Sequence, residues 1–488
     1  MTTNPSQNPA QHPAPNPAPE DQYIVEKVRG RDARPPLVLA ALMCVIGAFQ
    51  LNATMLSPAI GDMADRLHTN AGVIGWSSTV FLAVSAALAI LLPPYADKIG
   101  RRRALISSVA MMILGTVIAL VAPNTLWLMI GRGLQGFCGA TFSLGNLTLR
   151  AILEPRKFGA YMGLVAAINS GVAGIDTLAG GMITDAFGYR GIFGVILLVE
   201  VAAVILVFRW VPETRVAAAA SMDWPGALSM TGALWALNMV LTLGFSETGW
   251  TSPWTVGLFG AAVVLAICFV VRERRTPQPL IPLSVLAQRQ IWGLLGTTFF
   301  TLASAFSVLL FALPALSQDP AGFGMGGTVS ALMFLTPFSL LGWLLAPAAG
   351  WLAPRVGYRL VLRFGLAGTL LLSVGMVAGL GSKWALFALS LLMGATYSAA
   401  TNTALNALGV LYAPPERPGV LPGLNDAAYN IGAGIGMGVM ASVVASAVAN
   451  GDATGGYRTA LVIGAIASAA ALGFSFALPG RATADEKV

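Results

Sequence analysis

Long runs of apolar residues alternate with short polar stretches along almost the whole chain after residue 36. A helix needs about 20 apolar residues to cross the hydrocarbon layer of a membrane, and the runs have this length. Pro and Gly interrupt several of them, which membrane helices tolerate. The pattern predicts fourteen spans, at residues 37–60, 74–94, 104–122, 126–150, 158–181, 191–211, 225–245, 254–271, 291–316, 328–350, 359–379, 383–411, 419–447 and 458–477.

Composition supports a membrane protein. Charged residues make up 10% of the 488 residues and hydrophobic residues 56%, whereas soluble domains carry about 25% charged residues. The cysteines (Cys44, Cys138, Cys268) lie inside apolar runs, and the two histidines (His12, His68) lie outside them. We therefore expect no disulfide, no histidine-ligated metal site and no cofactor.

Basic residues gather between alternate spans. The clusters 27–34, 98–103, 156–157 and 272–275 fall on one side, while the other side has the scattered residues Arg66, Arg190, Lys383 and Arg458. Lys and Arg mark the cytoplasmic side of membrane proteins. The distribution predicts a multi-pass inner-membrane protein with both termini in the cytoplasm, and it does not indicate nucleic-acid binding. Residues 1–36, rich in Pro, Asn, Gln and Ala, predict a disordered tail rather than a signal peptide.

Two loops share a pattern. Residues 96–100 read Ala-Asp-Lys-Ile-Gly and residues 353–357 read Ala-Pro-Arg-Val-Gly, each after an inward-running span. Parallel repeats of six helices are a transporter architecture, with the substrate site between the halves. Fourteen spans then comprise two six-helix bundles and an inserted pair of helices.

The loop 97–102 (Asp-Lys-Ile-Gly-Arg-Arg) and the stretch 132–136 (Arg-Gly-Leu-Gln-Gly) together resemble the signatures of the major facilitator superfamily, and the chain is similar to its fourteen-helix drug:proton antiporter family. The resemblance implies an all-α membrane protein with the major facilitator fold. The expected organisation is a cytoplasmic tail (1–36), an N-terminal bundle (37–215), two inserted helices with the central loop (216–290), a C-terminal bundle (291–479) and a second tail (480–488).

The sequence departs from this family at positions that bear on the substrate. The resemblance implies an aspartate in the first helix, where this chain has Asn52, and a Gly-Pro pair in the fifth helix, where it has Asp176-Thr177. Antiport of a cationic drug is therefore less well supported than the fold. A lipid-like compound or a neutral metabolite is an open alternative.

Charges inside the spans need an explanation because each costs roughly 2.5–3.5 kcal/mol at the bilayer centre. The four deep ones are Arg132, Asp176, Glu200 and Asp426. We take them as candidates for proton coupling, in which a carboxyl gains and loses a proton during transport. The alternative is a structural tie between helices, which we favour for Glu200 because the resemblance places the sixth helix at the periphery.

Two further sets complete the candidate site. The resemblance implies a conformational latch of Asp97, Gly100 and Arg101, in which Asp97 meets the start of the helix near 419–423; the alternative is a solvated loop. Polar residues inside the spans predict a substrate cavity, because lipid cannot satisfy their amides: Gln50, Asn52, Gln135, Asn169, Asn402, Asn406 and Asn430.

The sequence thus predicts a proton-coupled secondary transporter that exports small lipophilic or drug-like molecules by alternating access. Its partners are a small-molecule substrate, protons and the lipid bilayer, its energy source is the proton gradient, and we expect a monomer. An importer or uniporter of the same fold is one alternative. A membrane enzyme and a lipid-handling or scaffold protein are less well supported, because the spans lack a catalytic cluster and the signature loop is intact.

Overall fold

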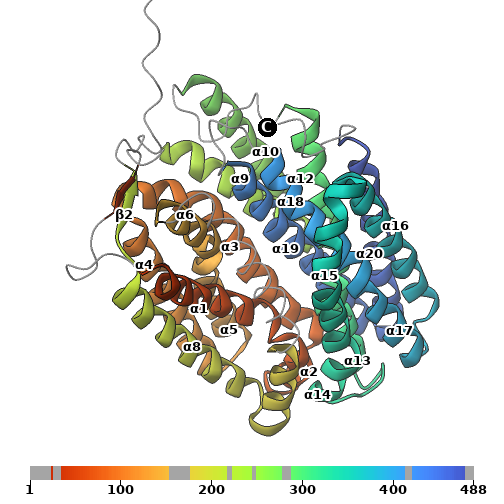
Figure 1. Ribbon diagram of the computed structural model, residues 1–488. Helices are drawn as coiled ribbons and strands as arrows, with labels where there is room; N and C mark the ends of the chain where they lie inside the picture. The colour runs from red at the N-terminus through yellow and green to blue at the C-terminus, as the bar shows by residue number, and fades with distance from the viewer. Residues whose placement is uncertain are drawn as a thin grey trace, which may run out of the picture.

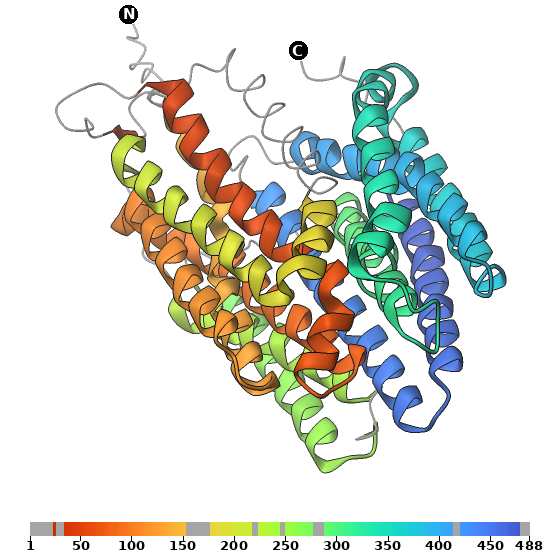
Figure 2. The ribbon, with the colours of Figure 1, turned by 90° about the horizontal axis from the view of Figure 1, so that it is seen from below.

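The computed structural model describes residues 23–25, 34–152, 176–216, 223–244, 249–276, 287–412 and 420–478. Apart from one two-stranded sheet, these residues fold almost entirely into helices (Figure 1). The helices form two groups, which we call the first group (residues 34–216) and the second group (residues 287–478), with α9 and α10 beside them (Figure 2). The predicted all-α membrane class is confirmed.

In the first group, described helices lie at each predicted span, although span 158–181 is described only from residue 176 and several of the other helices are broken. A 3-10 turn at Ser57–Ala59 separates α1 from α2, and another at Gly136–Ala140 separates α5 from α6. A further helix is described over residues 176–187. The helices are α1 (Pro35–Thr54), α2 (Ile60–Arg66), α3 (Ala71–Ile99), α4 (Arg101–Leu120), α5 (Thr125–Gln135), α6 (Thr141–Ile152) and α8 (Tyr189–Trp210).

The second group is built similarly but contains π-helical segments, which add a residue to a turn and often mark functional sites. They lie at Leu302–Phe306, Val308–Ala312, Ala331–Leu335 and Gly394–Asn402. The helices are α12 (Arg289–Thr301), α13 (Leu313–Gln318), α14 (Gly327–Ser330), α15 (Thr336–Val356), α16 (Tyr358–Ala378), α17 (Lys383–Met393), α18 (Thr403–Leu411), α19 (Val420–Ala449) and α20 (Ala453–Ser475). The inserted pair is α9 (Trp224–Gly244) and α10 (Pro253–Arg275).

Polar side chains start the helices at one end of the molecule. Asn70 accepts a hydrogen bond from the Val73 amide at 3.0 Å, and Asn124, Ser382 and Asp452 cap their helices in the same way. Such N-caps satisfy an amide that the first helical turn leaves unpaired. We call this the Asn70 end, and the opposite end the Gly100 end.

The repeated loops adopt the same conformation at the Gly100 end. Gly100 separates α3 from α4 with φ 105° and ψ 133°, and Gly357 separates α15 from α16 with φ 98° and ψ 127°. The Gly100 amide donates to the Ala96 carbonyl at 2.8 Å, and the Gly357 amide to the Ala353 carbonyl at 2.9 Å. Glycine is favoured at positive φ because it has no Cβ. The two turns therefore match as the predicted repeat requires.

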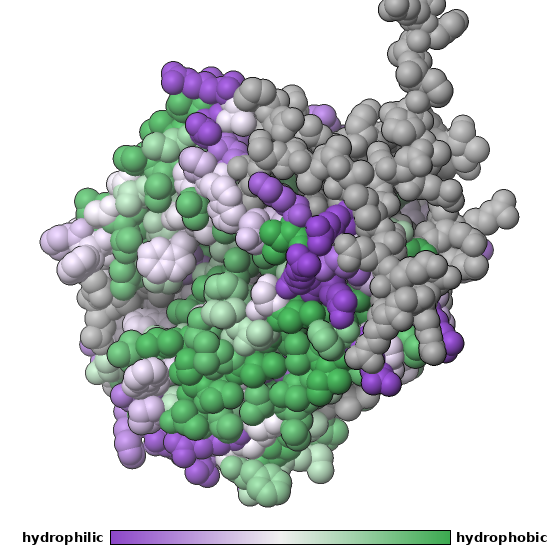
Figure 3. All heavy atoms as spheres, turned by 90° about the vertical axis from the view of Figure 1, so that its left-hand side faces the viewer, coloured by the Kyte–Doolittle hydropathy of each residue, from purple (hydrophilic) through white to green (hydrophobic). Residues whose placement is uncertain are grey.

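The exposed faces are strongly apolar. On α8, Leu198 and Ile205 are 72% and 55% exposed, and Figure 3 shows a broad hydrophobic surface on the side of the molecule seen at the left of Figure 1. Among the described residues, eleven helices are long and apolar enough to cross a membrane. The predicted spans 126–150, 158–181 and 225–245 are not among them, although α5, α6, residues 176–187 and α9 lie there. The count of fourteen stays a prediction.

The N-terminal segment differs from the predicted disordered tail at one place. Tyr23–Val25 forms strand β1, which pairs antiparallel with β2 (Thr214–Val216), just after α8. Tyr23 pairs with Val216, about 190 residues away in the chain, and this backbone pairing imposes order that local composition does not indicate. The rest of residues 1–33, and residues 479–488, lie outside the described chain.

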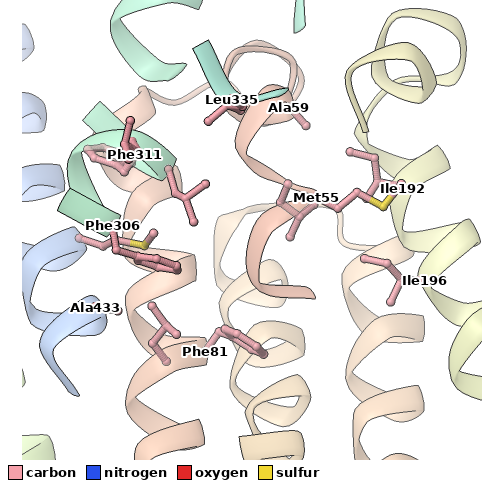
Figure 4. Close-up of a cluster of buried hydrophobic side chains, with 14 of the residues drawn as sticks. Met55, Ala59, Phe81, Ile192, Ile196, Phe306, Phe311, Leu335 and Ala433 are labelled. Atoms are coloured by element: carbon pink, nitrogen blue, oxygen red, sulfur yellow. The ribbon is translucent and has the colours of Figure 1, made fainter. Parts of the chain in front are cut away.

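One hydrophobic core connects the two groups. Phe81 of α3, Phe306 and Phe311 of the π-helical segments, and Ala433 of α19 belong to the same buried cluster (Figure 4). Helices α3 and α19 pack against each other, and α9 contacts both of them. Close approach depends on glycine here, since a Cβ at Gly72 would lie 2.4 Å from the Ala441 carbonyl oxygen. The functional site lies beside this contact between the groups.

Candidate functional site

A central cavity opens between the two groups. Gln50 and Thr54 of α1 line it from the first group. The second group contributes Phe306, Leu309, Leu310, Phe338, Ser339, Tyr397, Ser398, Asn402 and Tyr429. The cavity encloses about 70 Å³, room for several water molecules. Its described lining carries neutral polar groups and aromatic rings, and no charged side chain.

Aromatic rings form part of the wall. Phe338 and Tyr397 lie nearly parallel, with an angle of 13° between their planes and 6.3 Å between their centroids. Phe306 and Tyr429 meet edge to face at 5.8 Å. Tyr397 and Phe306 both lie on π-helical segments. Hydrogen-bonding groups together with aromatic faces suit a planar, polar, uncharged solute.

Asp176 lies directly behind the cavity wall. Its side chain is buried, and its Oδ2 accepts a hydrogen bond from the Thr54 hydroxyl at 2.5 Å. Thr54 itself lines the cavity, so the Thr54 hydroxyl lies between the Asp176 carboxyl and the cavity. Asp176 itself is not among the lining residues, and its role in proton coupling stays a prediction.

A second polar cluster is sealed inside the first group. Glu200 Oε1 accepts hydrogen bonds from Asn52 Nδ2 at 3.0 Å and from the Thr116 hydroxyl at 2.8 Å. Gln135 Nε2 donates to the same hydroxyl at 2.8 Å, and Arg132 Nη1 donates to Gln135 Oε1 at 2.8 Å. The Arg132 guanidinium also covers the Phe81 ring, 4.3 Å from its centroid. We call these five residues, Asn52, Thr116, Arg132, Gln135 and Glu200, the Glu200 network.

Every member of the Glu200 network is fully buried. Glu200 therefore faces the interior of the bundle and links α8 to α1 and α4. Asn52 and Gln135, expected to line the substrate cavity, are held in this network instead. The arrangement connects a buried positive charge to a buried carboxyl through neutral side chains.

The polar residues of the second group divide between the cavity and its surroundings. Asn402 lines the cavity, whereas Asn406 is exposed and donates to Asn402 Oδ1 at 3.3 Å. Asn430 is buried and donates to the backbone carbonyl of Asp426 at 2.9 Å. Asp426 is partly buried one helical turn from Tyr429 and is not among the cavity-lining residues. Asn169 lies outside the described residues.

The expected latch lies at the Gly100 end. Arg101 is buried and its Nη1 donates to the Leu147 carbonyl at 2.7 Å. Glu213, which follows α8, accepts a hydrogen bond from the Arg102 amide at 3.0 Å and lies 3.7 Å from Arg103 Nε. A carboxylate at this helix start is stabilised by the helix dipole. The backbone places Asp97 in the last turn of α3; the side chain of Asp97 lies outside the described part.

The two groups are in direct contact at the Asn70 end. Gln318 Oε1 accepts from the Gly61 amide at 2.8 Å, and Gln318 Nε2 donates to the Ser57 carbonyl at 3.2 Å. The Thr328 amide donates to Asp185 Oδ2 at 3.2 Å. A Cβ on Gly181 would lie 2.7 Å from Thr328 Cα. These contacts tie α2, the 3-10 turn before it and the helix at 176–187 to the second group at this end.

The comparison with known protein families agrees with the two groups and the cavity between them. The model of the Major Facilitator Superfamily matches residues 42–437. The chain belongs to the Major Facilitator Superfamily. It is a multi-pass membrane transporter of this superfamily, as its apolar helices and the cavity between its halves also indicate. The predicted superfamily is confirmed, and the narrower drug:proton antiporter family stays a prediction.

Relatives within the superfamily are named for different activities. The chain is 38% identical over 406 residues to a uridine/deoxyuridine transporter of Lactococcus lactis, covering 81% of this chain and 84% of that protein. It is 28% identical over 403 residues to the multidrug resistance protein Stp of Mycobacterium tuberculosis, covering 81% and 74%.

Solved structures support the major facilitator fold. A POT family transporter in complex with 5-aminolevulinic acid aligns with a TM-score of 0.63 at 14% identity, covering 91% of this chain and 96% of that one. The human organic anion transporter MFSD10 aligns with a TM-score of 0.59 at 14% identity, covering 90% and 100%.

Several residues of the site carry no strong signal in the sequence. Thr54, Thr116 and Tyr397 are ordinary residues of apolar helices, and Glu213 follows a proline outside the spans. Thr54 lies four residues after Gln50, on the same face of α1. That spacing could have added it to the predicted cavity.

Proposed function

We propose that this member of the Major Facilitator Superfamily is a proton-coupled secondary transporter of uncharged, nucleoside-like solutes. One observation carries the proposal: a cavity shared by both groups, lined by amides, hydroxyls and aromatic rings without a charge, with a buried carboxyl directly behind its wall. A nucleoside offers hydroxyls and a planar base to such a lining. The 38% identical relative named for uridine and deoxyuridine supports the same substrate class.

The proposed cycle is alternating access, in which the bundles at 37–215 and 291–479 rock about the cavity. The contacts of Gln318 and Asp185 close the Asn70 end in the present state. We propose that Asp97, Gly100 and Arg101 form the opposing latch, which holds the Gly100 end when the Asn70 end opens. Because the basic clusters mark the cytoplasmic side, we place the Gly100 end and both termini in the cytoplasm. We propose that the protein is a monomer in the inner membrane.

Proton coupling is assigned first to Asp176 and second to Asp426, because Asp176 is hydrogen-bonded to a cavity residue. Glu200 and Arg132 are fully buried away from the cavity lining, and we propose that they set the net charge in the interior of the first group. The expected mode is exchange, with solute and protons moving in opposite directions. Movement of one charge through 100 mV supplies about 2.3 kcal/mol, which suffices to drive useful accumulation.

Export of a drug-like molecule is a second candidate. The relatives at 28% identity include multidrug resistance proteins, and the rings of Phe306, Phe338, Tyr397 and Tyr429 would hold a lipophilic compound. Against a cationic drug stands the lack of a carboxylate among the described lining residues. In the first helix, where the resemblance implies an aspartate, this chain has the neutral Asn52, which donates a hydrogen bond to Glu200 away from the cavity.

Counterflow in proteoliposomes distinguishes the candidates. Vesicles are loaded with unlabelled uridine, diluted into trace labelled uridine, and then challenged with deoxyuridine, lipophilic cations and neutral drugs as competitors. Transient accumulation of labelled uridine that deoxyuridine inhibits supports the nucleoside proposal. Exchange of a labelled drug without any uridine counterflow would replace it with the second candidate.

A further inference from the structure

Asp176 reaches the cavity through one side chain. The Asp176 side chain is only 4% exposed and is not among the cavity-lining residues, whereas Thr54 is. The two side chains come from helices that pack closely, since a Cβ on Gly180 would lie 2.4 Å from the Met55 carbonyl oxygen. Any proton that passes between the cavity and Asp176 along the described contacts meets the Thr54 hydroxyl.

The contacts of this hydroxyl exceed what one hydrogen can serve. Thr54 Oγ1 lies 2.5 Å from Asp176 Oδ2 and 2.8 Å from the Gln50 carbonyl oxygen, both of them acceptors when Asp176 is ionised. A hydroxyl donates one hydrogen and accepts through its lone pairs. Both short contacts carry a hydrogen at once only if Asp176 holds a proton and donates it to Thr54, which in turn donates to Gln50. When Asp176 is ionised, the Thr54 hydrogen must turn towards it.

Charged groups on the neighbouring elements have other partners. Glu200 is held by Asn52 and Thr116, and Arg190 donates to the Ala122 carbonyl at 3.3 Å. Asp185 lies further along the same helix, about 14 Å away at 1.5 Å per residue, and accepts from Thr328. Helix α2 carries an ion pair of Asp62 with Arg66 and the exposed Asp65. Besides the backbone amide of Thr177, the hydrogen-bond partner of the Asp176 carboxyl among the described residues is therefore the Thr54 hydroxyl.

We propose that Thr54 is the proton relay between the substrate cavity and Asp176. In the loading step a hydronium ion in the cavity gives a proton to Thr54 Oγ1 while the original Thr54 hydrogen passes to Asp176 Oδ2. The hydronium becomes water, the carboxylate becomes a carboxylic acid, and Thr54 is unchanged. Release is the reverse. This role rests on the proposed function, because it names the path by which that coupling would run.

The relay also places proton and solute next to each other. Gln50 lines the cavity, and its Nε2 lies 3.5 Å from Thr54 Oγ1. A solute that binds the Gln50 amide therefore lies next to Thr54, whose hydroxyl reverses its hydrogen-bond direction when Asp176 gains or loses a proton. Thr54 is thus a positioning and relay residue, whose effect should appear in the ratio of protons to solute.

The test measures the number of protons moved per labelled uridine in proteoliposomes with an internal pH dye. It compares the wild type with Thr54→Val, Thr54→Ser and Asp176→Asn. Valine keeps the shape and removes the hydroxyl, while serine keeps the hydroxyl and removes a methyl. We expect Thr54→Val to slow solute-linked proton movement by about 100-fold, the lower limit of what a positioned proton-transfer group contributes, and to resemble Asp176→Asn. Thr54→Ser should retain coupling.

The controls separate the relay from other failures. Thr54→Ala replaces Thr54→Val as the hydroxyl-free variant if valine does not yield folded protein. Wild-type coupling by Thr54→Val, or equal loss in the serine and valine variants, would overturn the relay, because packing rather than the hydroxyl would then matter. If the wild type itself carries solute without moving protons, the proposed coupling fails and the relay fails with it.

Discussion

The Glu200 network makes a quantitative prediction about stability. Arg132 and Glu200 are both fully buried and are joined through Gln135 and Thr116 by hydrogen bonds of 2.8 Å. Glu200→Gln removes the negative charge and leaves Arg132 as a buried cation. Removing one partner of a buried ion pair costs about 3–5 kcal/mol when the partners touch. Since these two are linked through neutral side chains, we expect about 3 kcal/mol, the lower limit of that range.

A double-mutant cycle isolates the charge effect. Arg132→Gln should also destabilise, because it loses the bond to Gln135 and the contact over Phe81. In the double variant neither charge remains, so its loss of unfolding free energy should fall short of the sum of the single losses by about 1–3 kcal/mol.

Unfolding in mixed detergent micelles with increasing SDS measures these free energies. A matched cycle of Glu200→Gln with Asp62→Asn serves as the control, because Asp62 pairs with Arg66 at the Asn70 end, away from the network. The two losses of unfolding free energy should there add to within about 0.5 kcal/mol. Additive losses in the Glu200–Arg132 cycle would refute the reasoning that the network balances charge.

Three further substitutions have matched controls in the chain. Gly100→Ala should cost about 2–4 kcal/mol of unfolding free energy and Gly357→Ala about 1–2, because both lie at positive φ but only the Gly100 Cβ would strike the Glu213 carboxylate; equal SDS midpoints would contradict this. Asn402→Leu should raise the Kd for the solute by about 5- to 100-fold through loss of a polar cavity contact, while Asn450→Leu, at an exposed amide outside the cavity lining, should change it little, as titration calorimetry can measure. Gly181→Val should open the Asn70 end, since a Cβ there would meet Thr328, and maleimide labelling of Ser57→Cys in a background without the native cysteines should rise, by a factor of about 5 or more for a 1 kcal/mol overlap. Gly194→Val, with open space around the Cβ, should leave that labelling unchanged.

Much of the architecture could be predicted from the sequence because it depends on local patterns. Apolar runs predicted the positions of the helices, and the shared loop pattern predicted turns that Gly100 and Gly357 form with nearly equal angles. The cost of burying charge singled out Arg132, Asp176 and Glu200 before any contact was known.

Partners of these charges could not be predicted because they are distant in the chain. Asn52 meets Glu200 across 148 positions and Thr54 meets Asp176 across 122. Helix α8 is apolar on both faces, since lipid and protein interior favour similar side chains, so hydropathy could not show that Glu200 faces inwards while Leu198 faces outwards. The π-helical segments that place Tyr397 and Asn402 at the cavity follow from tertiary packing rather than from a local signal.

Uridine-driven proton movement in the wild type tests the central claim most directly. Proteoliposomes with an internal pH dye and equal pH on both sides receive labelled uridine outside. Proton-coupled exchange predicts that uridine entry raises the internal pH, and that Asp176→Asn abolishes the rise. A fall in internal pH would keep the coupling but make the protein a co-transporter. Uridine entry without any pH change, or no entry at all, would contradict the account.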